Sequence, residues 1–99
     1  MRFASKVDEN HAEIREAAKK MGAGWCDVFR LPNCCDAFMT YAGVTIAIEI
    51  KDGSKVLSKR KLTTGETKFS EAWVATGGKF AVIESIDQLR TLMTSMRAA

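Results

Sequence analysis

Histidine, proline and cysteine are scarce in this chain: its 99 residues include one His, one Pro and three Cys. A single histidine makes a zinc site unexpected, and an odd number of cysteines, two of them adjacent, does not fit a disulfide scaffold. The apolar runs are too short to span a bilayer, and residues 1–9 lack the apolar centre of a signal peptide. We therefore expect a soluble, cytoplasmic protein with reduced thiols and no membrane partner.

Glycine-rich phosphate loops are also missing. The glycines at 22–24 and at 77–78 lack the required spacing and follow expected helices, so no nucleotide cofactor is expected. Hydrophobic residues make up 46% of the chain and charged residues 27%, which are ordinary globular values and exclude disorder and coiled coil. A chain of this length predicts a single domain over residues 1–99.

Positive charge is concentrated in one short segment. The net charge is +3, yet residues 51–61 hold five basic residues against one acidic residue, a local +4. Such a segment favours contact with phosphate groups, although a solvated loop kept soluble by lysines has the same composition. The candidate DNA-binding residues are Lys55, Lys59, Arg60 and Lys61, with Lys68 in the helix expected next.

Hydrophobic periodicity predicts an α/β domain. Two-residue alternation indicates strands, and apolar residues three and four apart indicate helices. The predicted order is α-β-β-β-α-β-α, a mixed sheet flanked by helices. The expected elements are a helix over 8–21 capped by Asp8, strands over 25–31, 35–41 and 44–51, a helix over 64–75, a strand over 80–83, and a last helix that begins near Ser85.

The second and third strands form an expected hairpin. A two-residue loop at 42–43 makes the numbers of paired residues sum to 85, which brings apolar residues together and puts Asp36 opposite Glu49. A four-residue loop gives the same register, whereas a three-residue loop would move Glu49 to a neighbouring position. Ala-Gly is not the favoured type I′ sequence, so the type of loop stays open.

Opposed carboxylates repel each other unless they lie in water or a cation neutralises them. Lys51 follows on the same face of the strand as Glu49, so Asp36, Glu49 and Lys51 converge. Carboxylate oxygens suit Mg²⁺ or Mn²⁺, which polarises a phosphoryl oxygen, and a lysine stabilises charge that develops on the phosphate. The alternative is an exposed hairpin face with an ordinary salt bridge.

At these residues the chain resembles the PD-(D/E)xK nuclease superfamily, and more narrowly the small phage and bacterial VRR-NUC-type nucleases related to Holliday junction resolvases. The resemblance covers nearly all of residues 6–90. Cys35 stands where the superfamily name has Pro, and Glu66 stands where a Gln is common, so the role of Glu66 stays open. The segments that carry the resemblance are residues 7–14, Asp36, residues 49–55 and 58–63, the helical Glu66, Phe69 and Trp73, and residues 82–86.

The resemblance implies a restriction-endonuclease-like core and a Mg²⁺-dependent (or Mn²⁺-dependent) DNA endonuclease of a bacterium or a phage-infected cell. Asp36, Glu49 and the backbone carbonyl of Ile50 would hold the metal, and Lys51 would act on the attacking water. It also implies a homodimer that acts on branched DNA such as a Holliday junction. A first-helix residue would assist the metal: Glu13 is the choice, with Asn10 and His11 as alternatives.

Two rival functions stay open: a DNA-binding module that kept the fold without catalysis, and an interaction protein whose acidic and basic cluster is accidental. A solvated helix face explains the three first-helix candidates equally well. His11 is expected at the surface or as a capping group rather than as a general base. Trp25 and Trp73 are expected in the core, and the last-helix methionines Met93 and Met96 in the core or a dimer contact.

Overall fold

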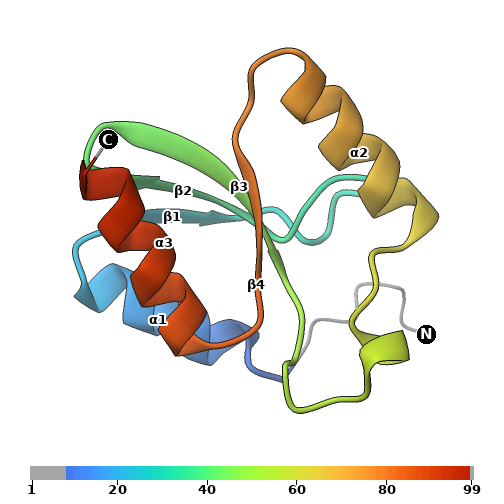
Figure 1. Cartoon of the computed structure of the whole chain (residues 1–99), viewed down its shortest axis with the longest axis horizontal. Helices are drawn as coiled ribbons and strands as arrows, with labels where there is room; N and C mark the ends of the chain where they lie inside the picture. The colour runs from blue at the N-terminus through green and yellow to red at the C-terminus, as the bar shows by residue number, and fades with distance from the viewer. Residues whose placement is uncertain (1–8, 99) are drawn as a thin grey trace.

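The computed structural model describes residues 9–98, and their elements follow the expected α-β-β-β-α-β-α order (Figure 1). Within those residues, none of the helices combines the length and the apolar character needed to cross a membrane. The elements are α1 (His11–Lys20), β1 (Gly24–Asp27), β2 (Ala37–Tyr41), β3 (Val44–Ile50), the 3₁₀ turn η1 (Leu57–Lys59), α2 (Thr64–Ala75), β4 (Phe80–Ile83) and α3 (Ile86–Ala98).

The four strands form one mixed sheet in the order β1-β2-β3-β4. The pairs β1–β2 and β2–β3 are antiparallel, and β3–β4 is parallel. Helices α1 and α3 pack together against one face of the sheet, while α2 lies against the other (Figure 1). The predicted α/β class, with helices on both faces of a mixed sheet, is therefore confirmed.

The β2–β3 hairpin has the predicted register. Tyr41 pairs with Val44 and Ala37 with Ile48, so the paired numbers sum to 85. Ala42 and Gly43 have φ angles of 53° and 79°, the two positive values that a type I′ turn requires. Glycine adopts this conformation freely, whereas Ala42 accepts a steric cost. The tight loop thus fixes the register that brings β3 alongside β2.

The main core lies between the sheet and the pair α1–α3. Alternate residues of β3 point into it, as the sequence predicts: Ile46, Ile48 and Ile50 are nearly inaccessible. The methionines Met93 and Met96 of α3 are also buried there, which confirms the core alternative for them. The remaining buried members of this core are Ile14, Ala18, Met39, Ile83 and Leu89.

A second apolar layer lies between the sheet and α2, and it consists of aromatic rings. The Trp73 ring is stacked on Phe69 at 5.4 Å between centroids and lies 5.5 Å from Phe38 of β2. The indole N–H of Trp73 donates to the Lys79 carbonyl at 2.7 Å. Trp73 is only partly buried, so it packs α2 onto the sheet rather than filling a closed core.

The observed elements differ from the expected ones at several points. The strand expected over 25–31 ends at Asp27, because the Leu31 N–H turns back to the Val28 carbonyl at 3.0 Å ahead of Pro32. The helix expected over 8–21 begins at His11, and its expected cap, Asp8, lies outside the described residues. The 3₁₀ turn within the basic segment was not expected from the sequence.

Candidate active site

The three residues singled out by the hairpin register do come together, on the sheet face that α2 covers. Glu49 lies in β3 and is 2% exposed. Lys51 directly follows β3, and its Nζ lies 3.7 Å from Glu49 Oε2. Asp36 precedes β2 and interacts electrostatically with Glu49. A fourth residue, Glu66 of α2, places Oε1 at 3.0 Å from Lys51 Nζ. We call these four residues the carboxylate–lysine cluster.

The backbone around the cluster fixes the acidic side chains. Regular pairing of β2 with β3 ends at Ala37 and Ile48, one residue short of the expected Asp36–Glu49 pair. The Asp36 carboxylate instead accepts a hydrogen bond from the Ile50 N–H at 2.7 Å. Asp36 is thereby held beside β3 by a charge-assisted hydrogen bond to the backbone.

A capping box at the start of α2 fixes Glu66. The Glu66 carboxylate accepts from the Thr63 N–H at 2.9 Å, and the Glu66 N–H donates to the Thr63 hydroxyl at 3.2 Å. This reciprocal pair satisfies backbone donors that the helix start leaves without partners. The residue whose role the sequence left open thus caps α2 and binds the Lys51 ammonium at the same time.

Glu49 is held in an environment that disfavours its charge. Burial, followed by the negative charges of Asp36 and Glu66, raises the pKa of Glu49 to about 10. Its Oε1 is buried without a hydrogen-bond partner. Glu66 has the opposite balance: burial raises its pKa, but hydrogen bonds with Thr63, Glu49 and Lys51 outweigh this and lower it. At Glu49, burial and the two neighbouring acids therefore outweigh the nearby Lys51 ammonium.

The donor set suits a hard cation. Within residues 9–98, the side chains of His, Cys, Asp and Glu do not form a metal-binding group of three or more. Mg²⁺ typically uses one or two carboxylates and keeps several waters, so the Asp36 and Glu49 carboxylates, with the Ile50 carbonyl that the resemblance implies, would be enough protein ligands. The partnerless Glu49 Oε1 fits such an ion, because a cation would supply the interaction that the buried oxygen lacks.

Of the three first-helix candidates, Glu13 lies away from the cluster. Its side chain is exposed and lines a cavity of about 710 Å³ with Asp52 and Glu84, which does not include Asp36 or Glu49. Asn10 reaches the ends of β3 and β4: its Nδ2 donates to the Lys51 carbonyl at 3.1 Å and to the Glu84 carbonyl at 3.3 Å. The Asn10 side chain thus binds two backbone carbonyls, and it does not cap α1.

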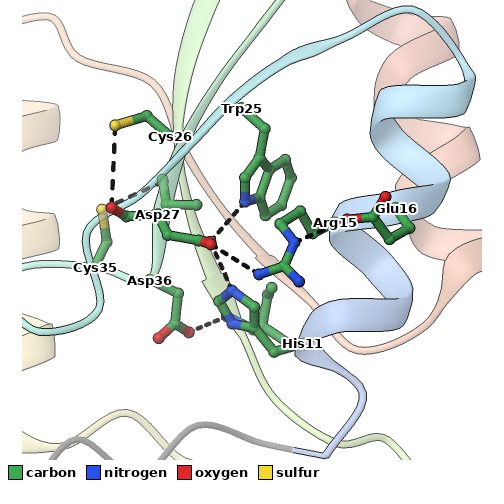
Figure 2. A network of polar contacts seen from close by, with 10 residues as sticks. His11, Arg15, Glu16, Trp25, Cys26, Asp27, Cys35 and Asp36 are labelled. Atoms are coloured by element: carbon green, nitrogen blue, oxygen red, sulfur yellow. Dashed lines mark hydrogen bonds and ion pairs between the residues drawn. The ribbon is translucent and has the colours of Figure 1, made fainter.

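His11 is buried, which corrects the expectation that it lies at the surface. It is 2% exposed, and its Nε2 lies 2.8 Å from Asp27 Oδ1 (Figure 2). Asp27 also accepts hydrogen bonds from Arg15 and Trp25, each at 2.8 Å. Burial raises the pKa of Asp27, but its hydrogen bonds with His11, Trp25 and Arg15 outweigh burial and lower it. This network fastens α1 to β1.

The basic segment is mostly open to solvent. Lys55, Lys59 and Lys61 are exposed, as is Lys68 on α2. Arg60 differs, because its guanidinium Nη1 lies 3.0 Å from Glu84 Oε1. Four of the five expected DNA contacts therefore have exposed side chains, while Arg60 also ties the segment to the end of β4.

The three cysteines are free thiols that differ in exposure. Cys35 is buried and Cys34 half-buried, but Cys26 is exposed on β1. Burial, with a smaller contribution from Cys34, raises the pKa of the Cys35 thiol to about 12, so Cys35 stays a neutral thiol beside Asp36.

Comparison with known proteins gave no match to a family model, a curated protein or a solved structure.

Proposed function

We propose that this protein is a metal-dependent DNA endonuclease with a restriction-endonuclease-like core. The observation that carries the proposal is the Glu49 carboxylate, which is buried beside two other acids and has an oxygen without a partner. The ion pair with Lys51 involves only Oε2 of Glu49, so it leaves Oε1 buried without a partner, and a buried polar atom without a partner costs stability. A chain keeps such a group when a ligand supplies the missing charge.

Mg²⁺ or Mn²⁺ held by Asp36, Glu49 and the Ile50 carbonyl would supply Lewis-acid polarisation of a phosphodiester and neutralise its charge. Lys51 has the position for the chemical step, because its ammonium lies beside both Glu49 and Glu66. A lysine there orients the attacking water and stabilises the charge that develops on the phosphate. Glu66 holds the Lys51 ammonium in place, so it acts as a positioning residue.

The exposed lysines after β3 support DNA as the substrate. Lys55, Lys59 and Lys61 follow the cluster within ten residues of Lys51, and ammonium groups at this spacing suit the phosphates of a nucleic acid backbone. Lysine contacts to phosphates carry no sequence information, which favours recognition of branched DNA by shape. A cytoplasmic homodimer, with one site for each of two strands at a junction, completes the proposal.

The test compares cleavage of a labelled four-way junction with cleavage of a linear duplex of the same sequence. The wild-type chain should cut in Mg²⁺ or Mn²⁺ and not in EDTA. Lys51→Ala should lower the single-turnover rate by about a hundredfold or more, with little change in junction binding. Lys20→Ala, which removes an exposed lysine of α1, is the matched control and should cut normally.

Three other results would change the proposal. Salt-dependent DNA binding without cutting in either metal would identify a DNA-binding module that lacks catalysis. Absence of binding at low salt would remove nucleic acid from the proposal and leave an interaction protein. Equal cutting of linear and branched DNA would contradict recognition by shape while it keeps the nuclease.

A further inference from the structure

Two large apolar side chains are exposed to solvent in the middle of the basic segment. Val56 is 65% exposed and Leu57 is 71% exposed. Lys55 precedes them and Lys59 follows, both with exposed side chains. Single exposed apolar residues are common on protein surfaces, but adjacent ones flanked by lysines combine apolar contact area with attraction for an anion. The nuclease mechanism proposed above makes no use of them.

The loop that carries this pair is held in shape from its base. The Gly53 N–H donates to the Glu84 carbonyl at 3.3 Å, and the Glu84 carboxylate binds Arg60 at 3.0 Å. Glu84 therefore closes the base of residues 53–60, which we call the 53–60 loop. At its tip, the Arg60 N–H donates to the Leu57 carbonyl at 2.9 Å and helps to form the 3₁₀ turn η1. Figure 1 shows η1 projecting from the body of the sheet.

We infer that Val56 and Leu57 form an apolar wedge that contacts unstacked bases at a branch point of DNA. Intact duplex presents phosphates to a basic surface but keeps its apolar base faces inside the stack. A junction, flap or end exposes those faces, and apolar side chains inserted at base steps are an established way for proteins to hold distorted DNA. Because Glu84 already fixes the loop, little ordering is needed when it binds.

The small apolar area of the wedge favours DNA over a lipid surface. A helix that binds membranes presents a long apolar face, whereas η1 has three residues and the wedge has two apolar side chains. The 53–60 loop also begins two residues after Lys51, so the base of the loop is joined directly to the carboxylate–lysine cluster. The inference rests on the proposed function for its choice of DNA as partner.

The experiment measures binding of the full chain to two DNA probes in Ca²⁺. One is a four-way junction with 2-aminopurine at the branch point, and the other is the linear duplex with the same label. The wild-type chain should bind the junction more tightly and raise its fluorescence as the labelled base unstacks. The double variant Val56→Ser/Leu57→Ser should lose about tenfold in junction affinity, with no rise in fluorescence and less than a twofold change on the duplex.

Val74→Ser is the matched control, because Val74 is 55% exposed on α2, and it should leave both affinities unchanged. An unchanged junction preference in the double variant would overturn the wedge, as would an equal loss on both probes. Preferential binding of the wild-type chain to phosphatidylserine vesicles would overturn the choice of DNA. Cleavage in Mg²⁺ is a separate readout. If the wild-type chain does not cut DNA but its preference for the junction still depends on Val56 and Leu57, the nuclease proposal is refuted and the wedge proposal stands.

Discussion

Replacing Glu49 by Gln tests the buried carboxyl group at the centre of the cluster. The pKa of Glu49 rises from 4.5 to about 10 on folding, chiefly through burial and then through the nearby Asp36 and Glu66. A raised pKa means that the folded state keeps a proton that the unfolded chain releases. The stability that this group contributes is therefore complete below pH 4.5 and is lost as the pH rises toward 10.

The size of the effect follows from proton linkage. One proton held only by the folded state gives a slope of about 1.4 kcal/mol per pH unit. Between about pH 5.5 and about pH 7.5, the metal-free protein should lose at most about 3 kcal/mol through Glu49. The Lys51 ammonium, 3.7 Å away, relieves part of this cost. We expect a loss of about 2 kcal/mol, or roughly 10 °C in Tm for a domain of this size.

Urea unfolding in EDTA at the two pH values measures this loss as the difference between two free energies of unfolding. Glutamine keeps the size of the side chain and cannot ionise, so Glu49→Gln should lack the pH-dependent loss seen in the wild-type chain. Glu71→Gln, an exposed change on α2, should follow the wild-type chain. Parallel curves for wild type and Glu49→Gln would refute the reasoning, because they would mean that Glu49 ionises alike in the folded and unfolded states.

Addition of Mg²⁺ extends the same measurement. An ion present at a free concentration of about a hundred times its Kd stabilises the folded state by about 2.7 kcal/mol. It should restore the wild-type stability at the higher pH, where the buried negative charge of Glu49 costs most. Glu49→Gln should gain much less, since it removes a charged ligand from a site with two carboxylates.

Two further predictions concern other parts of the molecule. Asp27→Asn should lower the free energy of urea unfolding at neutral pH by about 1–2 kcal/mol, because solvent weakens the hydrogen bonds of a side chain that is 28% exposed. Folding lowers the pKa of Asp27 below 3.8, so the difference between the variant and the wild-type chain should vanish in acid. Replacing Lys55, Lys59 and Lys61 together by Ala should lower the slope of log binding constant against log salt by about 2–3, whereas Lys20→Ala should leave the slope unchanged.

The order of elements and the hairpin register could be predicted because both follow from local patterns. The alternation in β3 and the short Ala42-Gly43 loop leave one register that buries the isoleucines. The strand expected over 25–31 was too long because its apolar residues, such as Val28 and Phe29, resemble a strand by composition alone. The turn that ends β1 depends on a contact with a later residue: the Val28 N–H donates to the Asp36 carbonyl at 2.8 Å.

The difference between local patterns and distant contacts also decides which residues of the candidate site could be predicted. Asp36, Glu49 and Lys51 are neighbours through the hairpin, so the sequence predicts their meeting. The partnership of Lys51 with Glu66 depends on where α2 docks, and no local pattern fixes that position. The capping-box spacing of Thr63 and Glu66 was the available signal that Glu66 lies in the first turn of α2, close to the end of β3 along the chain.

The Asn10 side chain has a consequence for how the site forms in time. Its amide joins the start of α1 to the ends of β3 and β4, across sequence separations of 41 and 74 residues. Contacts between such distant segments form only after the chain has closed large loops, which makes them slow to appear during folding. The backbone at Lys51 thus reaches its final position when the first and last thirds of the chain meet. A nascent chain still lacking β4 would carry the hairpin acids without the geometry that makes them a site.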